Sequence, residues 1–374
     1  MEFKLKLNAS QISDALLHFA HARILTLARI KTHRAKDPAC MIEYKTLHIK
    51  KSIPLPRSNV NVRARLEVLS IFCYASFMQP ISIIVPTYNR LAMLKDCLAA
   101  LQALRYPDYE IIVVNDGSAD GTRGWLNSIV NEKIRVIHHE KNQGLSAARN
   151  SGIIAARYQL IAFIDDDCVA HPNWLVAMEK EFDNPRIGFV IGKTVYMREG
   201  YRGHFPERVV HNDCRWPKGC NIAYRKEVFS SAGNFDDAFF RYNNEDSEMA
   251  IRAVAAGFLF ASAPHAVVSH QKTLWTAQSL LRSARNASVW PILKQKYPAS
   301  YRIFNPPITA GYIVNAEDYA LLLFLPLTIP FLLIRYFLNG KRDLKLFFTK
   351  WPRWLLLRRL LLWRESIRIR TWMI

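Results

Sequence analysis

The stretch Leu160-Ile161-Ala162-Phe163-Ile164-Asp165-Asp166-Asp167 places an apolar run directly before three consecutive aspartates. The apolar run is typical of a fully buried strand, so the carboxylates follow the end of that strand. Ligands of open α/β sheets bind at the carboxyl ends of the strands. Adjacent carboxylates repel one another unless a cation lies among them. The stretch therefore predicts a divalent cation, and with it a diphosphate; the alternative is an acidic surface turn.

The formal charge of +20 is concentrated at the two ends of the chain. Residues 1–77 carry 13 Lys/Arg against 5 Asp/Glu, and residues 335–374 carry 11 against 2, which leaves 27 against 24 between them. A nucleic-acid-binding protein more often carries its basic charge on the folded domain. The nearly neutral middle therefore argues against nucleic acid as the partner, and the basic ends favour an anionic membrane surface.

The cysteines form no CxxC pair and no regular ladder, which favours reduced thiols in a cytosolic setting over a disulfide framework or a zinc site. They are Cys40, Cys73, Cys97, Cys168, Cys214 and Cys220.

Strand-like and helix-like segments alternate from residue 80 onwards. The expected strands are 81–85, 109–114, 134–137, 160–164, 188–192, 258–263 and 266–270. Helical patterns of about ten to fifteen residues between the first four predict an α/β fold with a mostly parallel, Rossmann-like sheet and right-handed crossovers. The sequence contains neither GxGxxG nor GxxxxGK[ST], so it lacks the loops whose backbone amides bind phosphate in other nucleotide-binding proteins. A cation bound by the aspartates would have to neutralise the phosphate instead.

Polar and glycine-containing segments recur at the ends of these strands in a specific order. They are Val85-Pro86-Thr87-Tyr88-Asn89; Val114-Asn115-Asp116-Gly117-Ser118 with Asp120 and Thr122; Asn142-Gln143-Gly144 with Ala148-Arg149-Asn150; Phe163-Ile164-Asp165-Asp166-Asp167; Gly233-Asn234-Phe235-Asp236; and Glu245-Asp246. This ordered set resembles the family-2 glycosyltransferases with the GT-A fold, over roughly residues 80 to 272. Asn115 departs from the family pattern, which commonly has a second aspartate there.

The resemblance implies a binding site for a nucleotide-sugar and a divalent cation. In it, the residues that would border the nucleoside are Pro86, Thr87, Tyr88 and Arg90. Asp116 would hydrogen-bond the base, and Asn115 would contact the base or ribose. The nucleotide pocket would be lined by Lys141, Gly144 and Arg149. Asp165 and Asp166 would face the ribose and the metal, and Asp167 would be the direct ligand of Mg²⁺ or Mn²⁺. His270 resembles a further metal ligand of some relatives, although a lone histidine is more often structural.

The resemblance also implies a catalytic base at the pair Glu245-Asp246. Asp246 would take the proton from the acceptor hydroxyl, and Glu245 would orient the acceptor or support the loop. One base and direct attack give a single displacement with inversion at the anomeric centre. The alternative is that both side chains only cap the first turn of a helix, where acidic groups suit the helix dipole.

The chain outside this region divides into three further segments. We expect a catalytic domain over 78–272, a helical acceptor-side region over 273–316 and a membrane-associated segment over 317–374. Residues 1–77 are either a basic extension, disordered or weakly helical, or a mis-assigned start with Met78 as the true first residue; we favour the second. No signal-peptide pattern is found in them.

The C-terminal segment combines an uncharged stretch with a basic one. Tyr319–Ile334 is free of charge and contains Pro326 and Pro330. Its sixteen residues are fewer than the roughly 20 that span a bilayer, and 319–338 reaches that length. The stretch therefore spans the membrane, lies in it, or is a buried core helix. Lys341–Arg370 has the composition of an interfacial basic helix on an anionic cytoplasmic leaflet.

These features together predict a membrane-associated inverting glycosyltransferase at the cytoplasmic face of a bacterial inner membrane. It would use a nucleotide-diphosphate sugar, Mg²⁺ or Mn²⁺, and a glycan or polyprenyl-linked acceptor in envelope or exopolysaccharide synthesis. The alternative is a catalytically degenerate nucleotide-sugar-binding subunit or scaffold at the membrane. A processive synthase is disfavoured because no QxxRW motif occurs.

Overall fold

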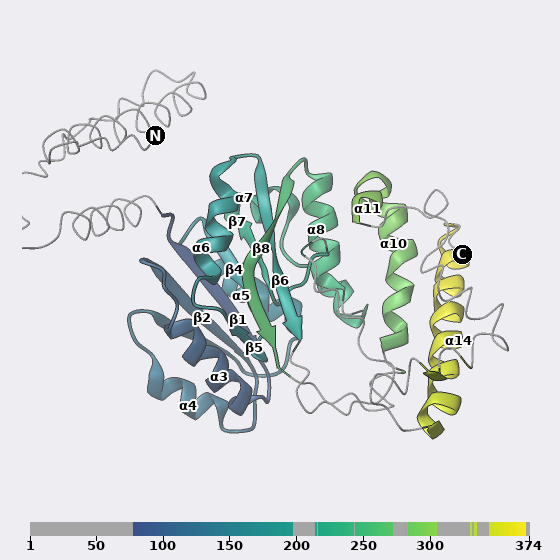
Figure 1. Cartoon of the computed structure of the whole chain (residues 1–374), viewed down its shortest axis with the longest axis horizontal. Helices are drawn as coiled ribbons and strands as arrows, with labels where there is room; N and C mark the ends of the chain where they lie inside the picture. The colour runs from purple at the N-terminus through teal and green to yellow at the C-terminus, as the bar shows by residue number, and fades with distance from the viewer. Residues whose placement is uncertain are drawn as a thin grey trace, which may run out of the picture. The chain divides into compact units, whose positions relative to one another are not determined.

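The computed structural model describes the chain in segments (Figure 1). The described residues are 78–196, 214, 216–242, 244–271, 281, 283–304, 330, 333–334 and 344–371. The chain divides into the units Met1–Phe77 and Met78–Ile374, and the described residues all lie in the second. The predicted N-terminal extension and nearly all of 319–338 lie outside the described residues, so the expectations for them stay predictions.

The first half of the sheet is parallel, as the alternation of segments predicts. Its strands lie in the order β3-β2-β1-β4 and are β1 (Ile81–Thr87), β2 (Tyr109–Asp116), β3 (Ile134–His139) and β4 (Leu160–Phe163). The helices between them are α3 (Leu91–Gln102), α4 (Thr122–Ile129) and α5 (Leu145–Ala155). All four predicted strands are confirmed, and β1, β2 and β3 each extend a further two residues toward their polar ends.

The second half of the sheet is mixed. It continues from β4 through β7 (Ile222–Arg225), β6 (Ile187–Tyr196), β8 (Leu259–His270) and β5 (Cys168–Ala170). The pairs β4–β7, β7–β6 and β8–β5 are antiparallel, whereas β6–β8 is parallel.

The prediction of two short strands between 258 and 270 is wrong, because the structure forms one strand, β8. Its register against β6 shifts from Gly192↔Ala263 to Lys193↔Val267. Pro264 lies at this shift, and its missing N–H cannot join a ladder. The strand therefore continues through the register shift, whereas the sequence pattern indicated an end at residue 263 and a new strand from residue 266.

Helices cover both faces of the sheet, and each face has its own apolar core. Side chains alternate along a strand, so Ile83 and Val85 pack with Leu98 of α3 on one face while Ile84 packs with Ile153 of α5 on the other. Both cores are fully buried, which explains why these strands read as continuous apolar runs rather than alternating ones.

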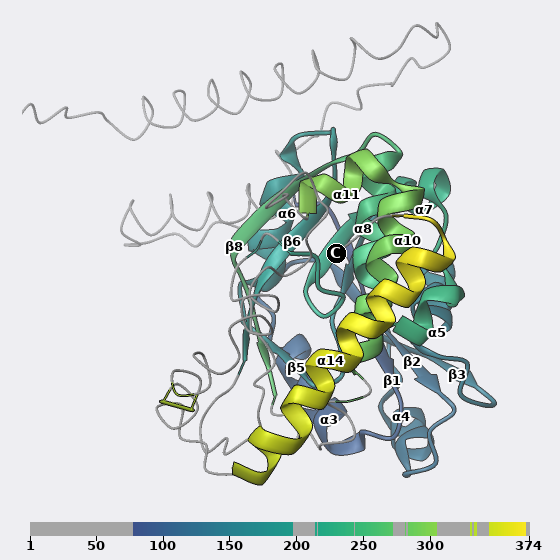
Figure 2. The same cartoon turned by 90° about the vertical axis from the view of Figure 1, so that its right-hand side faces the viewer.

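The remaining helices follow the later strands. They are α6 (Trp174–Glu179), η1 (Lys180–Asp183), α7 (Lys226–Ala232), η2 (Asp237–Tyr242), α8 (Glu245–Ala255), η3 (Ala284–Ser288), α10 (Val289–Lys296), α11 (Pro298–Phe304) and α14 (Leu344–Arg368). Helix α14 packs on η3 and α10, and in Figure 2 it lies on the side of α10 that faces the viewer. Its Leu362 is buried in the same core as α8 and α10. None of the helices in the described part of the chain is both long and apolar enough to cross a membrane.

Gly117 lies where the loop that follows β2 closely approaches the loop that follows β3. Its φ of +75° lies in the left-handed region that disfavours side chains, and a Cβ there would lie 2.6 Å from the carbonyl carbon of Lys141. The residue after Asp116 therefore has to be glycine for the two loops to meet at this edge.

Candidate active site

The aspartate triplet lies at the carboxyl edge of the parallel half-sheet. The N–H of Ile164 still donates to Ile84 O of β1, at 3.2 Å, so the chain leaves the sheet at Asp165 beside the end of β1. Asp166 and Asp167 are both only 4% exposed. This burial excludes the alternative of an acidic surface turn.

Two of the three carboxylates share one guanidinium. Nη1 of Arg90 donates to Asp166 Oδ1 at 3.1 Å and to Asp167 Oδ2 at 2.8 Å. Thr87 Oγ1 donates to Asp166 Oδ2 at 2.7 Å. Burial raises the pKa of Asp166 to about 6, and the repulsion from Asp165 and Asp167 adds to it, although Arg90 and Thr87 act in the opposite direction. The Arg90 side chain is 45% exposed, so it compensates the buried charge only in part.

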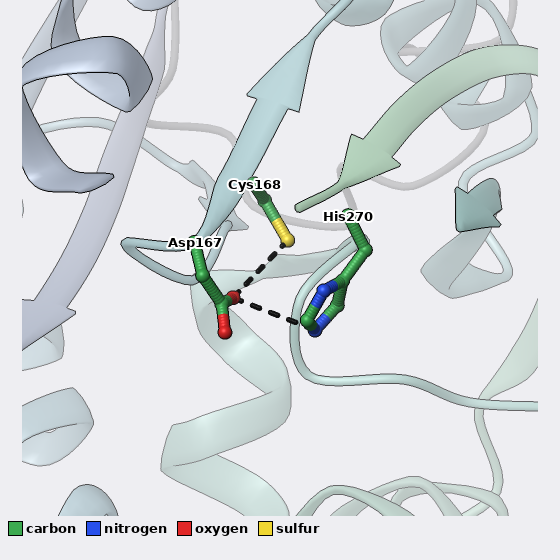
Figure 3. A group of neighbouring side chains, drawn as sticks. All are labelled: Asp167, Cys168 and His270. Atoms are coloured by element: carbon green, nitrogen blue, oxygen red, sulfur yellow. Dashed lines mark hydrogen bonds and ion pairs between the residues drawn. The ribbon is translucent and has the colours of Figure 1, made fainter. Parts of the chain in front are cut away.

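Asp167, Cys168 and His270 form a compact group of possible metal ligands (Figure 3). Their ligand atoms all lie within 4.8 Å of one another, and all three residues are buried. His270 Nε2 lies 3.4 Å from Asp167 Oδ1, and Cys168 Sγ lies 3.6 Å from the same oxygen. The antiparallel pairing of β5 and β8 sets Cys168 directly opposite His270.

The imidazole of His270 is oriented so that a cation fits between it and Asp167. Its Nδ1 lies 2.8 Å from the backbone oxygen of Gln271, which can only accept, so Nδ1 carries the proton. Nε2 of the ring then faces Oδ1 of Asp167 at 3.4 Å. An imidazole nitrogen and a carboxylate oxygen at this separation can both be ligands of one metal ion. The residues present therefore fit a divalent cation.

Arg149 joins the triplet to the predicted catalytic pair. Its Nη1 donates to Glu245 Oε1 at 2.7 Å and its Nη2 to Asp165 Oδ1 at 3.0 Å. The guanidinium and Glu245 are buried. Burial raises the pKa of Glu245, and nearby Asp246 raises it further, while Arg149 opposes both. Arg149 is therefore a bridge between two carboxylates rather than a lone pocket-lining residue, which sequence reasoning missed.

Asp246 is held by backbone N–H groups. Its Oδ2 accepts from Gly219 N at 2.9 Å and its Oδ1 from Ser247 N at 2.7 Å, and the residue is partly exposed. A Cβ on Gly219 would overlap the guanidinium of Arg149, so the residue that holds Asp246 has no room for a side chain. Since Glu245 pairs with Arg149 and Asp246 with Gly219, simple helix capping does not account for the pair.

The carboxylate of Asp116 accepts hydrogen bonds from the backbone at the start of α5. Its two oxygens accept from Gln143 N at 2.9 Å, Gly144 N at 2.8 Å and His139 Nδ1 at 2.7 Å. A carboxylate has about four acceptor sites, so these bonds leave room for one more donor, such as a nucleobase. The carboxylate also lies where the positive end of the α5 dipole stabilises it.

The other predicted residues lie around the same strand ends. Asn115 is buried; its Oδ1 accepts from Ser118 N, and its Nδ2 donates to His138 Nδ1, each at 3.1 Å. Pro86 is buried in β1, whereas Tyr88 is 46% exposed and Lys141 is exposed. The last two side chains are thus available to a ligand.

Sequence reasoning also missed Cys168 and Gly219. Cys168 directly follows the triplet, and the only signal for its place beside His270 is the pairing of two strands about a hundred residues apart. Burial, contact with Cys220 and nearby Asp165 and Asp167 raise the pKa of its thiol. Gly219 shows no signal apart from standing just before a strand.

Comparison with known proteins gives one family. The model of glycosyl transferase family 2 matches residues 82–248. Chondroitin synthase of Escherichia coli is 28% identical over 272 residues, which cover 59% of this chain and 39% of that protein. The putative glycosyltransferase EpsH of Bacillus subtilis is 41% identical over 100 residues, 26% of this chain and 29% of that protein. The chain thus spans less than half the length of each.

A solved structure supports the fold. The mannosyltransferase PcManGT from Pyrobaculum calidifontis, in complex with GDP-Man and Mn²⁺, superposes with a TM-score of 0.51 at 18% identity. The superposition covers 77% of this chain and 88% of that one. At this identity the likeness is one of fold, and it is a GT-A-like α/β fold.

Proposed function

Residues 82–248 belong to glycosyl transferase family 2, and from this premise we propose that the chain moves a sugar from a nucleotide-diphosphate sugar to a hydroxyl of a glycan or lipid-linked acceptor, with inversion. The observation that carries the proposal is the bridge through Arg149, which links Asp165 of the triplet to Glu245 beside Asp246. A donor-binding group and an acceptor-activating group are thereby held in one site.

The donor would bind over the ends of β1 and β2. Tyr88 and Lys141 are exposed there, and Asp116, which accepts from the N–H of Gly144 at the start of α5, has one acceptor site left for a base. Arg90, which neutralises Asp166 and Asp167, can turn to an incoming diphosphate because its side chain is half exposed.

Asp167 and His270 would hold Mg²⁺ or Mn²⁺, and the ion would supply positive charge to the leaving diphosphate. Asp165 directs Oδ1 to Arg149, and we propose that its Oδ2 faces the ribose or the cation. The carboxylate of Asp166 would add negative charge at the donor side of the site.

Asp246 would act as the general base. It takes the proton of the acceptor hydroxyl, the acceptor oxygen forms a bond to the anomeric carbon, and the bond from that carbon to the diphosphate oxygen breaks. Backbone N–H groups of Gly219 and Ser247 fix the carboxylate, so it is oriented before the acceptor arrives. A single displacement of this kind inverts the anomeric configuration.

The test is a panel of nucleotide-sugars titrated with Mn²⁺, followed by two variants. Asp246→Asn should bind the identified donor normally and lose transfer, whereas Asp167→Ala should lose the cation dependence of donor binding. Asp237→Asn, on an exposed side chain of η2, is the matched control and should retain both. Near-wild-type turnover by Asp246→Asn would refute the base assignment.

We also propose that α14 docks the protein on an anionic membrane surface, where a lipid-linked acceptor would be found. Arg359 and Leu362 of this helix are buried. On its exposed face, apolar side chains follow one another at the spacing i, i+4, i+7, i+11, which places them in one row along the helix. This row is Leu356, Leu360, Trp363 and Ile367, with exposures of 49% for Leu360 and 76% for Ile367.

Basic side chains flank this apolar row. Arg353, Arg364 and Arg368 are all exposed, and the nearby acidic Glu365 is paired with Arg368. Apolar side chains bordered by positive charge match the boundary between acyl chains and anionic headgroups. The surface therefore suits the cytoplasmic leaflet of a bacterial inner membrane, which is the location we propose.

A further inference from the structure

The ligand group Asp167–Cys168–His270 has a donor set that a magnesium site does not need. It offers one oxygen, one sulfur and one nitrogen atom, all within 4.8 Å of one another (Figure 3). Mg²⁺ takes oxygen ligands almost exclusively. Thiolate and imidazole together instead favour zinc and similar borderline ions.

The backbone fixes these donors in place. The N–H of Gln271 donates to the backbone oxygen of Asp167 at 2.7 Å, which ties the end of β8 to the triplet. The β5–β8 pairing holds Cys168 opposite His270, and the carbonyl of Gln271 orients the imidazole. Little rearrangement is therefore required to collect the three atoms around an ion.

The two oxygens of Asp167 face different partners. Oδ2 accepts from Arg90, while Oδ1 lies next to the sulfur of Cys168 and Nε2 of His270. An ion at Oδ1 consequently does not require Arg90 to leave.

We propose that Asp167 Oδ1, Cys168 Sγ and His270 Nε2 form a binding site for Zn²⁺ or a similar borderline divalent ion, which competes with Mg²⁺ or Mn²⁺ for Asp167 and His270. Binding forms a metal–sulfur bond and releases the thiol proton to solvent, with no change of oxidation state. The inference concerns the cation site of the proposed transferase, but it requires no turnover. Zinc would thus inhibit a magnesium- or manganese-supported reaction.

Cobalt spectroscopy of the full chain tests the site directly. After removal of bound metals with a chelator, Co²⁺ should produce a near-ultraviolet sulfur-to-cobalt charge-transfer band, and stoichiometric Zn²⁺ should remove it. Cys168→Ser should lose the band. Calorimetry should show Zn²⁺ affinity at least about tenfold lower in this variant, with Mn²⁺ affinity changed by less than about threefold.

The controls separate Cys168 from the other thiols. Cys214→Ser and Cys97→Ser alter buried cysteines outside the ligand group and should keep both the band and the zinc affinity. Cys168→Ala serves if the serine variant does not fold, as judged by circular dichroism. An absent band in the wild-type chain, or an unchanged zinc affinity in a folded Cys168 variant, overturns the proposal.

One variant separates this inference from the proposed function. Asp246→Asn changes a residue outside the ligand group and should retain the cobalt band in full. A cobalt band in the wild-type chain, together with no transfer from any nucleotide-sugar of the panel, would support the zinc site and count against the transferase. Sugar transfer without a band would do the opposite.

Discussion

Arg149 and Glu245 form a buried ion pair with 2.7 Å between Nη1 and Oε1, and the same guanidinium holds Asp165 at 3.0 Å. The three residues come from α5, from α8 and from the segment after β4. A single cation thus neutralises carboxylates from the donor side and the acceptor side of the proposed site. The positions of Asp165 and Glu245 therefore both depend on the side chain of Arg149.

Replacing Arg149 by Met should strongly destabilise the protein. Glu245 would be left buried without its partner, and breaking a buried pair in this way costs about 3–5 kcal/mol. Urea unfolding followed by circular dichroism measures the loss. Arg157→Met is the matched control, because the Arg157 side chain is 61% exposed and lies 3.8 Å from Glu110, and about 0–1 kcal/mol is expected.

The double variant Arg149→Met/Glu245→Gln refines this prediction. Removing the second charge should recover part of the lost stability, because an uncharged amide is less costly to bury than a lone carboxylate. Equal stability of the single and the double variant would show that the charge of Glu245 is not what the arginine compensates.

Arg90→Gln should increase the affinity of the donor-free protein for Mn²⁺. The guanidinium lies on Asp166 and Asp167 and repels a second cation, so its removal should gain about 1 kcal/mol, or roughly fivefold in affinity. Calorimetry without nucleotide measures the change. Arg123→Gln, which removes an exposed partner of Glu140, should leave the affinity unaltered. Weaker Mn²⁺ binding by Arg90→Gln would mean that Arg90 organises the cation site instead.

Glu110 should make stability depend on pH in the acid range. Burial alone would raise its pKa, but bonds from Arg157 N, Ser82 and Arg135 outweigh burial and lower it. With the folded pKa below the unfolded one, the unfolded chain binds more protons, so this contribution is present above about pH 4.5 and lost as the pH falls below it.

Glu110→Gln tests this sign. The variant should be less stable than wild type at pH 7 by about 1–3 kcal/mol, and the difference should shrink between pH 4.5 and 3. Urea unfolding at several pH values measures it, with Glu132→Gln, on an exposed side chain, as the control. A difference that is constant with pH would contradict the lowered pKa.

The four strands of the parallel half-sheet and its polar edge could be predicted from the sequence. Continuous apolar runs such as Ile81–Val85 report burial on both faces, and polar residues after each run mark the carboxyl ends. These features depend only on neighbours in the chain. The same is true of the triplet at the end of β4.

The contacts that couple the site were not predictable in this way. The place of Cys168 opposite His270 depends on antiparallel pairing between β5 and β8, and the Arg149–Glu245 pair joins residues 96 positions apart. Local periodicity carries no information on such pairings. The two strands expected over 258–263 and 266–270 form one strand, β8, whose register against β6 shifts at Pro264.

Helix α14 should bind anionic vesicles through its exposed row and the arginines beside it. Each basic residue near such a surface contributes about 1 kcal/mol, so Arg364→Gln/Arg368→Gln should weaken binding of the full chain by roughly 30-fold. Leu360→Glu should weaken it through the apolar row. Flotation with phosphatidylglycerol-containing vesicles measures both, and added salt should reduce wild-type binding. Arg123→Gln/Arg186→Gln changes two exposed arginines outside α14 and should bind normally. Equal loss in this control would mean that net charge, rather than α14, drives the association.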